Sequence, residues 1–295
     1  MGRQEPRGVA AVIGVGAGLG TALAQRFASE YDVALVARER SKLEELAGKL
    51  DAAGGHALAV AADMSKGDEI HAAFEQIRAQ LGEVRVLLYN AAMRPFGKLM
   101  ETKPSTFENT WRVNAFGAFL CSQEVVPAML NKGRGAILFT GATAGTRPFA
   151  TSAAFGPAKF ALRGLAQVMA RDLGPQGIHV AYINVDGAID MPFIRKLRPD
   201  LKEQDMLRPA AIANILGNAW AGGIAPDFAA ALAVGGTRLH LYGKRDPRPA
   251  RKMGHLAAIA ETALEARTRV AEAALQLRRP VTSSPTRALE TRSLE

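Results

Sequence analysis

Cysteine, aromatic residues and long apolar runs are all scarce in this chain. Its 295 residues include one cysteine, Cys121, so a disulfide framework is excluded and a reducing, cytoplasmic compartment is expected. Cys121 lies in an apolar helical stretch (114–130) and is interpreted as a small buried hydrophobe. No run of 18 apolar residues occurs and the start of the chain is polar, so neither a membrane partner nor secretion is expected.

Acidic residues are outnumbered by basic ones, most strongly near the end of the chain. The net charge of +9 divides into +3 for residues 1–206 and +6 for residues 207–295. The basic part has no stacking aromatics between its basic residues and no nucleic-acid-binding motif. A nucleic-acid partner is therefore not expected, and a phosphate ligand or a solvated end explains the charge better.

Short apolar runs alternate with stretches of helical periodicity over the first two thirds of the chain. The runs cover residues 8–14, 32–37, 56–62, 85–89, 135–140 and 178–184. Continuous apolar strands between helices predict an α/β fold whose parallel sheet is covered on both faces. Right-handed crossovers make this a doubly wound, Rossmann-type sheet with ligands outside the carboxyl ends of its strands.

After residue 206 the pattern changes, which predicts a first domain over 1–206, a basic appendage over 207–279 and a disordered tail over 280–295. The elements expected in the appendage are a helix over 209–221, a strand over 237–242, a basic loop over 243–254 and a helix over 255–279. The first of these helices and the strand could complete the sheet of the first domain.

A glycine-rich turn follows the first predicted strand and opens a helix. Gly14, Gly18 and Gly20 allow a tight turn and a close backbone approach, so that a pyrophosphate can rest on the first amides of the helix, including that of Leu19. A tight turn without a ligand is the alternative. Because the turn starts a strand–helix–strand unit, a dinucleotide site is the better interpretation.

The end of the second predicted strand bears on which dinucleotide binds. An acid at this point would hold a ribose hydroxyl and favour NAD, but the position is Ala37 and Arg38 follows it. The planar guanidinium of Arg38 suits a 2′-phosphate, so NADP(H) is the expected cofactor. The alternative is that Arg38 and Arg40 are ordinary surface charges at a helix start.

Further motifs complete a resemblance to a known family. Asp63 follows the third predicted strand, Asn90 stands in Tyr-Asn-Ala-Ala, Asn114 in Arg-Val-Asn-Ala and Lys159 in Phe-Gly-Pro-Ala-Lys. Together with the glycine spacing, they make residues 8–206 resemble the short-chain dehydrogenase/reductase family. The resemblance implies that Asp63 contacts the adenine and that Asn90 belongs to the cofactor site, although both residue types are also common in turns.

The resemblance also implies four catalytic positions, of which two match. Asn114 and Lys159 stand where the family has its Asn and its Lys, the latter also holding the nicotinamide ribose. Phe155 and Ala142 stand where it has the proton-donating Tyr and the substrate-orienting Ser, with Thr143 as a candidate replacement for the Ser hydroxyl. A positioned general acid contributes about 10²–10⁴ in rate. Proton transfer is therefore expected to be weak or altered.

The resemblance implies an NADP(H)-dependent oxidoreductase that acts on an unidentified carbonyl or alcohol and assembles as a dimer or tetramer. A small-molecule substrate is expected, and no metal site is predicted. Whether such a site turns over at all is left open. The alternatives are an inactive nucleotide-binding scaffold and a protein that binds a ribonucleotide phosphate through its basic appendage.

That last alternative depends on a second resemblance. Residues 209–279, with Tyr-Gly-Lys at 242–244 and Arg-Lys-Met-Gly-His at 251–255, resemble the carboxy-terminal subdomain of the ATP-grasp enzyme 5-(carboxyamino)imidazole ribonucleotide synthase. The resemblance implies that Lys244 and Arg251 reach a substrate phosphate. Residues 1–208 do not resemble the ATP-binding domains that complete such a site, so no carboxylation is expected.

Overall fold

The computed structural model describes residues 7–190, 192–202, 206–220, 224–249 and 251–277. The chain divides into two compact units, Met1–Pro199 and Asp200–Glu295, each with its own sheet and core. This division lies slightly before the predicted boundary at residue 206. The tail predicted to be disordered, 280–295, lies outside the described residues.

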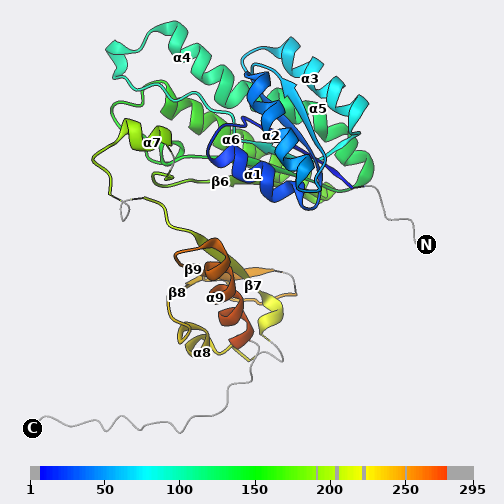
Figure 1. Ribbon diagram of the computed structural model, residues 1–295. Helices are drawn as coiled ribbons and strands as arrows, with labels where there is room; N and C mark the ends of the chain where they lie inside the picture. Colours follow the sequence, from blue (N-terminus) through cyan, green and yellow to red (C-terminus); the bar gives the residue numbers. More distant parts are fainter. Residues whose placement is uncertain (1–6, 191, 203–205, 221–223, 250, 278–295) are drawn as a thin grey trace, which may run out of the picture. The chain divides into compact units, whose positions relative to one another are not determined.

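The first unit, which carries the labels α1 to α7 in Figure 1, is built on a six-stranded parallel sheet with the strand order β3-β2-β1-β4-β5-β6. The strands are β1 (Val9–Ile13), β2 (Asp32–Ala37), β3 (Ala57–Ala61), β4 (Val84–Tyr89), β5 (Gly135–Thr140) and β6 (Ile178–Ile183). The helices are α1 (Leu19–Ala28), α2 (Arg40–Ala52), α3 (Gly67–Gln80), α4 (Pro104–Trp111), α5 (Gly117–Lys132), α6 (Phe155–Leu173) and α7 (Pro192–Leu197). The predicted doubly wound α/β fold is confirmed.

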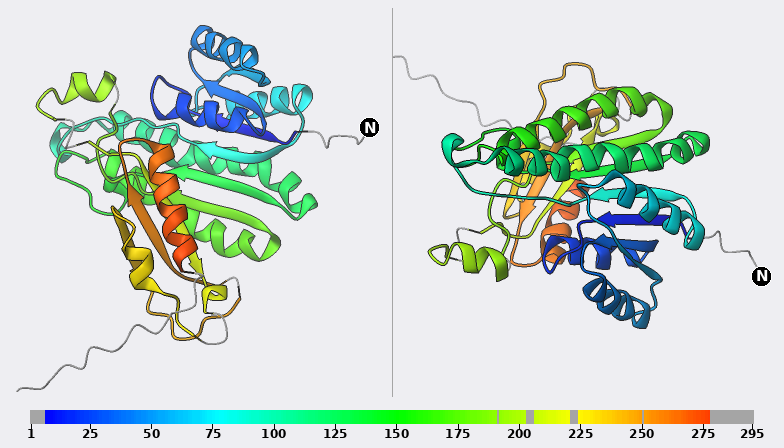
Figure 2. Two further views of the ribbon diagram at one scale, coloured as in Figure 1. Left: turned by 60° about the horizontal axis from the view of Figure 1, so that its bottom comes forward. Right: turned by 90° about the horizontal axis from the view of Figure 1, so that it is seen from above.

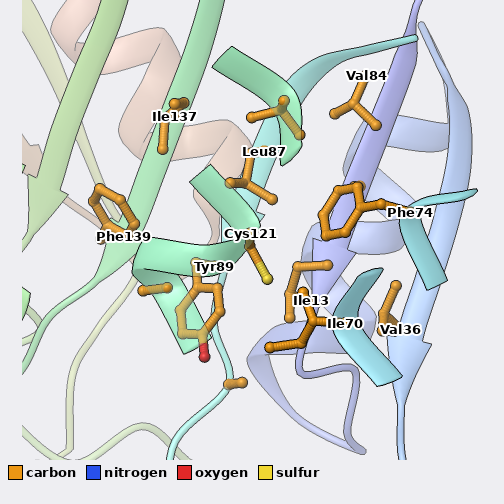
Figure 3. Packing of buried hydrophobic residues seen from close by; sticks show 14 of the residues in the cluster. Ile13, Val36, Ile70, Phe74, Val84, Leu87, Tyr89, Cys121, Ile137 and Phe139 are labelled. Carbon is orange, nitrogen blue, oxygen red and sulfur yellow. The ribbon is translucent and has the colours of Figure 1, made fainter. Parts of the chain in front are cut away.

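Alternate residues of each central strand face opposite sides of the sheet. In β1, Val9, Ala11 and Ile13 pack into the core beneath α3, α5 and α6, and the two residues between them pack against α1 and α2. Figure 3 shows the first of these cores, where the Phe74 ring lies among aliphatic side chains. All five β1 residues are buried, which explains why the strand is continuously apolar in sequence.

The α4–α5 region forms one continuous helical stretch, Pro104–Lys132. It is the one helix among the described residues that is long and apolar enough to cross a membrane by length and composition. Its α5 part packs against β4, β5 and α3 and places Cys121, Val125 and Met129 in the core. Cys121 is a buried free thiol, as expected, and its burial raises its pKa. The composition of this stretch therefore fits a core helix.

The second unit is a three-stranded antiparallel sheet in the order β7-β9-β8, with helix α9 packed on β7 and β9 (Figure 2). Its elements are β7 (Ala210–Leu216), α8 (Phe228–Leu232), β8 (Thr237–Leu241), β9 (Lys252–Ile259) and α9 (Ala263–Gln276). Leu256 and Ala258 of β9 and Val270 of α9 form the centre of its small core. The strand predicted over 237–242 is confirmed as β8.

Three other predictions for this unit are wrong. The helix predicted over 209–221 is instead the strand β7, and the helix predicted over 255–279 divides into the end of β9 and α9. Alanine-rich segments favour a helix locally, but here alternate β7 residues up to Ile215 pack against α9, and this packing outweighs the local propensity. Nor does the appendage complete the parallel sheet, because β7 and β8 both pair with β9.

Candidate functional site

The glycine turn after β1 packs closely against the loop that follows β4. Gly14 has φ +88°, and a Cβ there would lie 2.3 Å from the Ala91 nitrogen. A Cβ on Gly20 would lie 2.6 Å from the Gly14 carbonyl oxygen. Asn90 stabilises the same turn, since its Nδ2 donates to that carbonyl at 2.9 Å and its amide donates to the Ile13 carbonyl at 2.8 Å. Only glycine fits at either position of the turn.

The start of α1 leaves room and donors for a phosphate group. The amides of Thr21 and Ala22 bond to the carbonyls of Gly16 and Gly18, so the amides of Leu19 and Gly20 remain as donors at the helix start. No atom would lie within 4 Å of a Cβ on Gly16. This open, amide-lined turn fits the pyrophosphate of a dinucleotide.

Arg38 is exposed at the end of β2 and makes no hydrogen bond or salt bridge within the described part of the chain. Its neighbours are paired, Glu39 with Lys42 and Arg40 with Glu44. Arg38 is therefore available to an external phosphate, and the paired Arg40 is the ordinary surface charge of the two.

Asp63 does not line the cavity described below, but its carboxyl is close enough to Arg38 to feel the charge of the guanidinium. Its carboxylate accepts from the amide and the hydroxyl of Ser65, at 2.9 and 2.8 Å. Burial raises the pKa of the Asp63 carboxyl, but the hydrogen bonds from Ser65 and the charge of Arg38 outweigh burial and lower it. Asp63 is thus held ionised in a turn after β3.

A cavity of about 300 Å³ opens at the carboxyl ends of β1, β4, β5 and β6. It runs from the glycine turn at Gly14–Gly20 and Asn90 to Lys159 and Thr143. Most of its remaining lining is apolar, with Phe155 as part of the wall. The sequence-predicted glycines, Asn90, Lys159 and Thr143 therefore share one cavity, as expected for a site at the carboxyl edge of an open sheet.

Lys159 is the buried cation of this cavity. Its side chain is 2% exposed, and its Nζ donates to the Thr140 carbonyl at 2.9 Å. Burial lowers the pKa of Lys159 to about 7. The Phe155 ring, one helical turn earlier, has its centroid 5.7 Å from Nζ and carries no proton to exchange. Lys159 therefore has no ionisable partner at residue 155.

Thr143 lines the cavity, but its hydroxyl proton is engaged. Its Oγ1 donates to Asp186 Oδ1 at 2.6 Å, and Asp186 Oδ2 accepts from Arg147 at 3.1 Å. The neighbouring Ala142 presents a methyl group to the cavity, and its amide donates to the Tyr182 hydroxyl at 3.3 Å. Tyr182 does not line the cavity. Thr143 thus presents an acceptor oxygen to the cavity, whereas a replacement for the Ser hydroxyl was expected to donate a hydrogen bond to the substrate oxygen.

Asn114 does not line the cavity and lies in the π-helical segment η2 (Arg112–Phe116) between α4 and α5. Its Nδ2 donates to the carbonyls of Met93 and Thr110, at 2.8 and 2.9 Å. Its Oδ1 is buried without a hydrogen-bond partner, unlike any other side-chain oxygen or nitrogen of the described residues. An unsatisfied buried acceptor of this kind marks a position for an ordered water.

Arg94, on the loop after β4, also lines the cavity and was not predicted from the sequence. Its guanidinium carbon lies 5.8 Å from the centroid of the Phe155 ring and 5.0 Å from that of the Phe96 ring. Burial lowers the pKa of Arg94. The sequence feature that could have indicated Arg94 is its position: it is an arginine between the apolar residues Met93 and Pro95, two positions after the Asn-Ala-Ala motif.

The two cations predicted to bind phosphate in the second unit have partners within that unit. Lys244 Nζ donates to the Lys252 carbonyl at 2.9 Å, and Arg251 donates to the Asp246 carbonyl at 2.9 Å. Arg251 also lies 3.7 Å from the Asp246 carboxylate. A phosphate would have to replace these contacts.

Comparison with known families gives two matches that meet near the division between the units. The profile of the short chain dehydrogenase family matches residues 8–202. The profile of the phosphoribosylaminoimidazole carboxylase C-terminal domain matches residues 210–269.

Individual relatives agree with the first match. A 3-oxoacyl-(acyl-carrier-protein) reductase of Staphylococcus epidermidis is 32% identical over 197 residues, which are 66% of this chain and 80% of that protein. A solved short-chain dehydrogenase from Rhodopseudomonas palustris is 35% identical with a TM-score of 0.59, covering 67% of this chain and 92% of that one. A metagenomic short-chain oxidoreductase solved in complex with NADP is 32% identical with a TM-score of 0.58, covering 64% and 83%. This chain belongs to the short-chain dehydrogenase family.

Proposed function

We propose that the first unit binds NADP(H) and transfers hydride between its nicotinamide and a small carbonyl or alcohol substrate, with proton transfer that uses no group at residue 155 or 142. The observation that carries this proposal is the cavity that joins the open glycine turn to the buried Lys159. The unpaired Arg38 supports NADP(H) over NAD(H), and the relative in complex with NADP agrees with it.

The cofactor, when bound, supplies or accepts the hydride, and the protein must manage the accompanying proton. Phe155 and Ala142 have no proton to donate to a substrate oxygen. Lys159 is the group we assign to proton exchange, because it lines the cavity and burial brings its pKa to about 7. We assign the buried Asn114 Oδ1, which has no partner among the described residues, to hold a water that takes part in this exchange.

Thr143 and Asp186 favour the oxidation direction. A substrate hydroxyl can donate to Thr143 Oγ1, whose own proton already lies between it and the Asp186 carboxylate at 2.6 Å. During oxidation of an alcohol, Thr143 would accept the hydroxyl proton while its own proton passed to Asp186. In the reduction direction the Thr143–Asp186 pair has no free donor for a carbonyl oxygen and Lys159 is left as the proton source, so ordinary carbonyl reduction should be slow.

The test is a fluorescence titration of NADPH and NADH with the wild type, Arg38→Ala and, as a matched control, Arg40→Ala. We expect NADPH to bind more tightly and Arg38→Ala to weaken it by about 10–100-fold, the equivalent of one or two charge-assisted hydrogen bonds, with NADH and Arg40→Ala unaffected. Equal affinities, or no loss in Arg38→Ala, contradict the cofactor assignment. NADPH binding without turnover of any alcohol or carbonyl would identify an inactive scaffold instead.

A second candidate function concerns the second unit alone. Its match to the carboxylase C-terminal domain favours binding of a ribonucleotide phosphate by Lys244 and Arg251. Calorimetric titration with ribose 5-phosphate tests this role. Lys244→Ala and Arg251→Ala should each lose binding, and Lys252→Ala, as the control, should keep it. No heat with the wild type would rule out this role.

We also propose that the protein is a cytoplasmic dimer or tetramer. Trp111 and Phe116 stack at 5.3 Å and Phe116 and Phe119 at 6.3 Å, forming an aromatic strip across α4 and α5. Trp111 and Phe119 are both exposed, so the strip supports a subunit interface. The free, buried thiol of Cys121 is compatible with a reducing compartment. Light scattering of the wild type and Phe119→Glu tests the assembly, and a monomeric wild type contradicts it.

A further inference from the structure

Arg94 is the feature of the cavity that the proposed hydride transfer leaves unused. It approaches the Phe155 ring at 5.8 Å, while Lys159 approaches the same ring at 5.7 Å. The two cations therefore border the part of the cavity next to Phe155. Arg94 makes no hydrogen bond or salt bridge with any residue that the structure describes.

The charges around the cavity leave Arg94 without a balancing acid. Arg94 and Lys159 are the two titratable residues of its lining, and no Asp or Glu belongs to that lining. The nearest carboxylates in sequence to the β6 end of the cavity are Asp186, paired with Arg147, and Asp190, paired with Arg195 at 2.5 and 2.6 Å. Among the described residues, each nearby acid thus already has its own arginine.

A guanidinium that lies against two aromatic rings keeps its planar face covered and its N–H edge available. Such an edge matches a carboxylate, which accepts two parallel hydrogen bonds in the same plane. A single arginine is less well suited to a phosphate dianion, whose three oxygens usually need further donors. The apolar wall formed by Phe155 and Phe149 would then contact the carbon chain of the ligand.

We propose that Arg94 binds a carboxylate of the substrate, so that the protein acts on a small hydroxy or oxo acid. The proposal rests on the proposed function, since it assigns the substrate class of that site. The carboxylate lies at Arg94, the carbon chain crosses the Phe155 ring, and the reacting oxygen lies on the Lys159 and Thr143 side. Arg94 is the residue that determines specificity in this arrangement.

The experiment compares 2-oxopentanoate and 4-oxopentanoate with their uncharged methyl esters. Binding is measured by ligand-observed nuclear magnetic resonance, both to the protein without cofactor and to the protein saturated with NADPH. The variants are Arg94→Gln, Arg94→Lys and, as a matched control, Arg112→Gln, which removes another arginine that lies over a ring (Phe116, 5.9 Å) outside the cavity lining. NADPH affinity is measured for every variant.

We expect at least one acid to bind the wild type at least tenfold more tightly than its ester. This ratio should fall to about one in Arg94→Gln, be partly kept in Arg94→Lys and be unchanged in Arg112→Gln, while NADPH affinity stays constant in all of them. Should Arg94→Gln fail to fold, the acid-to-ester ratios of the wild type and Arg94→Lys still decide the matter.

Three results would overturn the proposal. The first is an acid-to-ester ratio near one in the wild type, and the second is a preference for dihydroxyacetone phosphate over both acids. The third is a loss of NADPH affinity in Arg94→Gln, which would assign Arg94 to the cofactor. If the wild type did not bind NADPH, the proposed function would be refuted. The acid-to-ester affinity ratios measured without cofactor would then still show whether Arg94 binds a carboxylate.

Discussion

Replacing Lys159 with methionine should change how the stability of the first unit depends on pH. Lys159 is 2% exposed, and burial lowers its pKa from 10.5 to about 7. Between these two values the unfolded chain binds one proton more than the folded chain does. The free energy of unfolding of the wild type therefore rises as the pH rises through this window.

The magnitude follows from the two pKa values. A full proton difference gives about 1.4 kcal/mol per pH unit, so between about pH 7.5 and 9.5 the wild type should gain roughly 2–3 kcal/mol from Lys159. Lys159→Met removes this contribution. Its other effect, an unsatisfied Thr140 carbonyl that costs about 1–3 kcal/mol, does not depend on pH in this range.

Urea unfolding at both pH values measures the effect. The chain has two tryptophans, Trp111 in the first unit and Trp220 in the second, so a Trp220→Phe background makes the fluorescence report on the first unit. Lys132→Met, an exposed lysine at the end of α5, is the control and should follow the wild type. If Lys159→Met also gained stability in parallel with the wild type, Lys159 would titrate normally and could not exchange protons near neutral pH.

Four further outcomes follow from the site. Gly14→Ala should lower the free energy of unfolding by roughly 2–5 kcal/mol, through its positive φ and a Cβ contact of 2.3 Å, as judged by urea unfolding. Gly16→Ala, whose Cβ meets no atom within 4 Å, should unfold like the wild type and still bind NADPH at least tenfold more weakly in the fluorescence titration. Phe155→Tyr with Ala142→Ser should raise NADPH-dependent carbonyl reduction at least tenfold where either change alone raises it little, because both groups act on one oxygen; a wild type at ordinary rates would refute this. A fragment of residues 1–207 should bind NADPH as the full chain does, since all residues that line the cavity lie in the first unit, and a lost affinity would show otherwise.

The first unit could be predicted well from the sequence because its signals are local. Its strands are short runs of mainly apolar residues, of which β1 is buried throughout, and the turn at Gly14 requires a backbone conformation that glycine adopts freely. Once the strands are parallel, their carboxyl ends meet, so the shared cavity of Asn90, Thr143 and Lys159 follows from topology.

The second unit was predicted less well because its strands are decided by tertiary contacts. Alanines in β7 and β9 carry little intrinsic preference for a strand, and their pairing becomes favourable only when α9 covers the sheet. The engagement of Thr143 with Asp186 could not be predicted either, because the two residues are distant in sequence and meet where β5 and β6 end. Arg94 was missed because nothing in its local sequence shows that Phe155 would lie beside it.

A crystal structure of the protein with NADPH tests the central claim most directly. We expect the pyrophosphate on the amides of Leu19 and Gly20, the 2′-phosphate within hydrogen-bond distance of Arg38, and the nicotinamide in the cavity beside Phe155 and Lys159. A dinucleotide that leaves this cavity empty, or a 2′-phosphate that turns away from Arg38, would contradict the account.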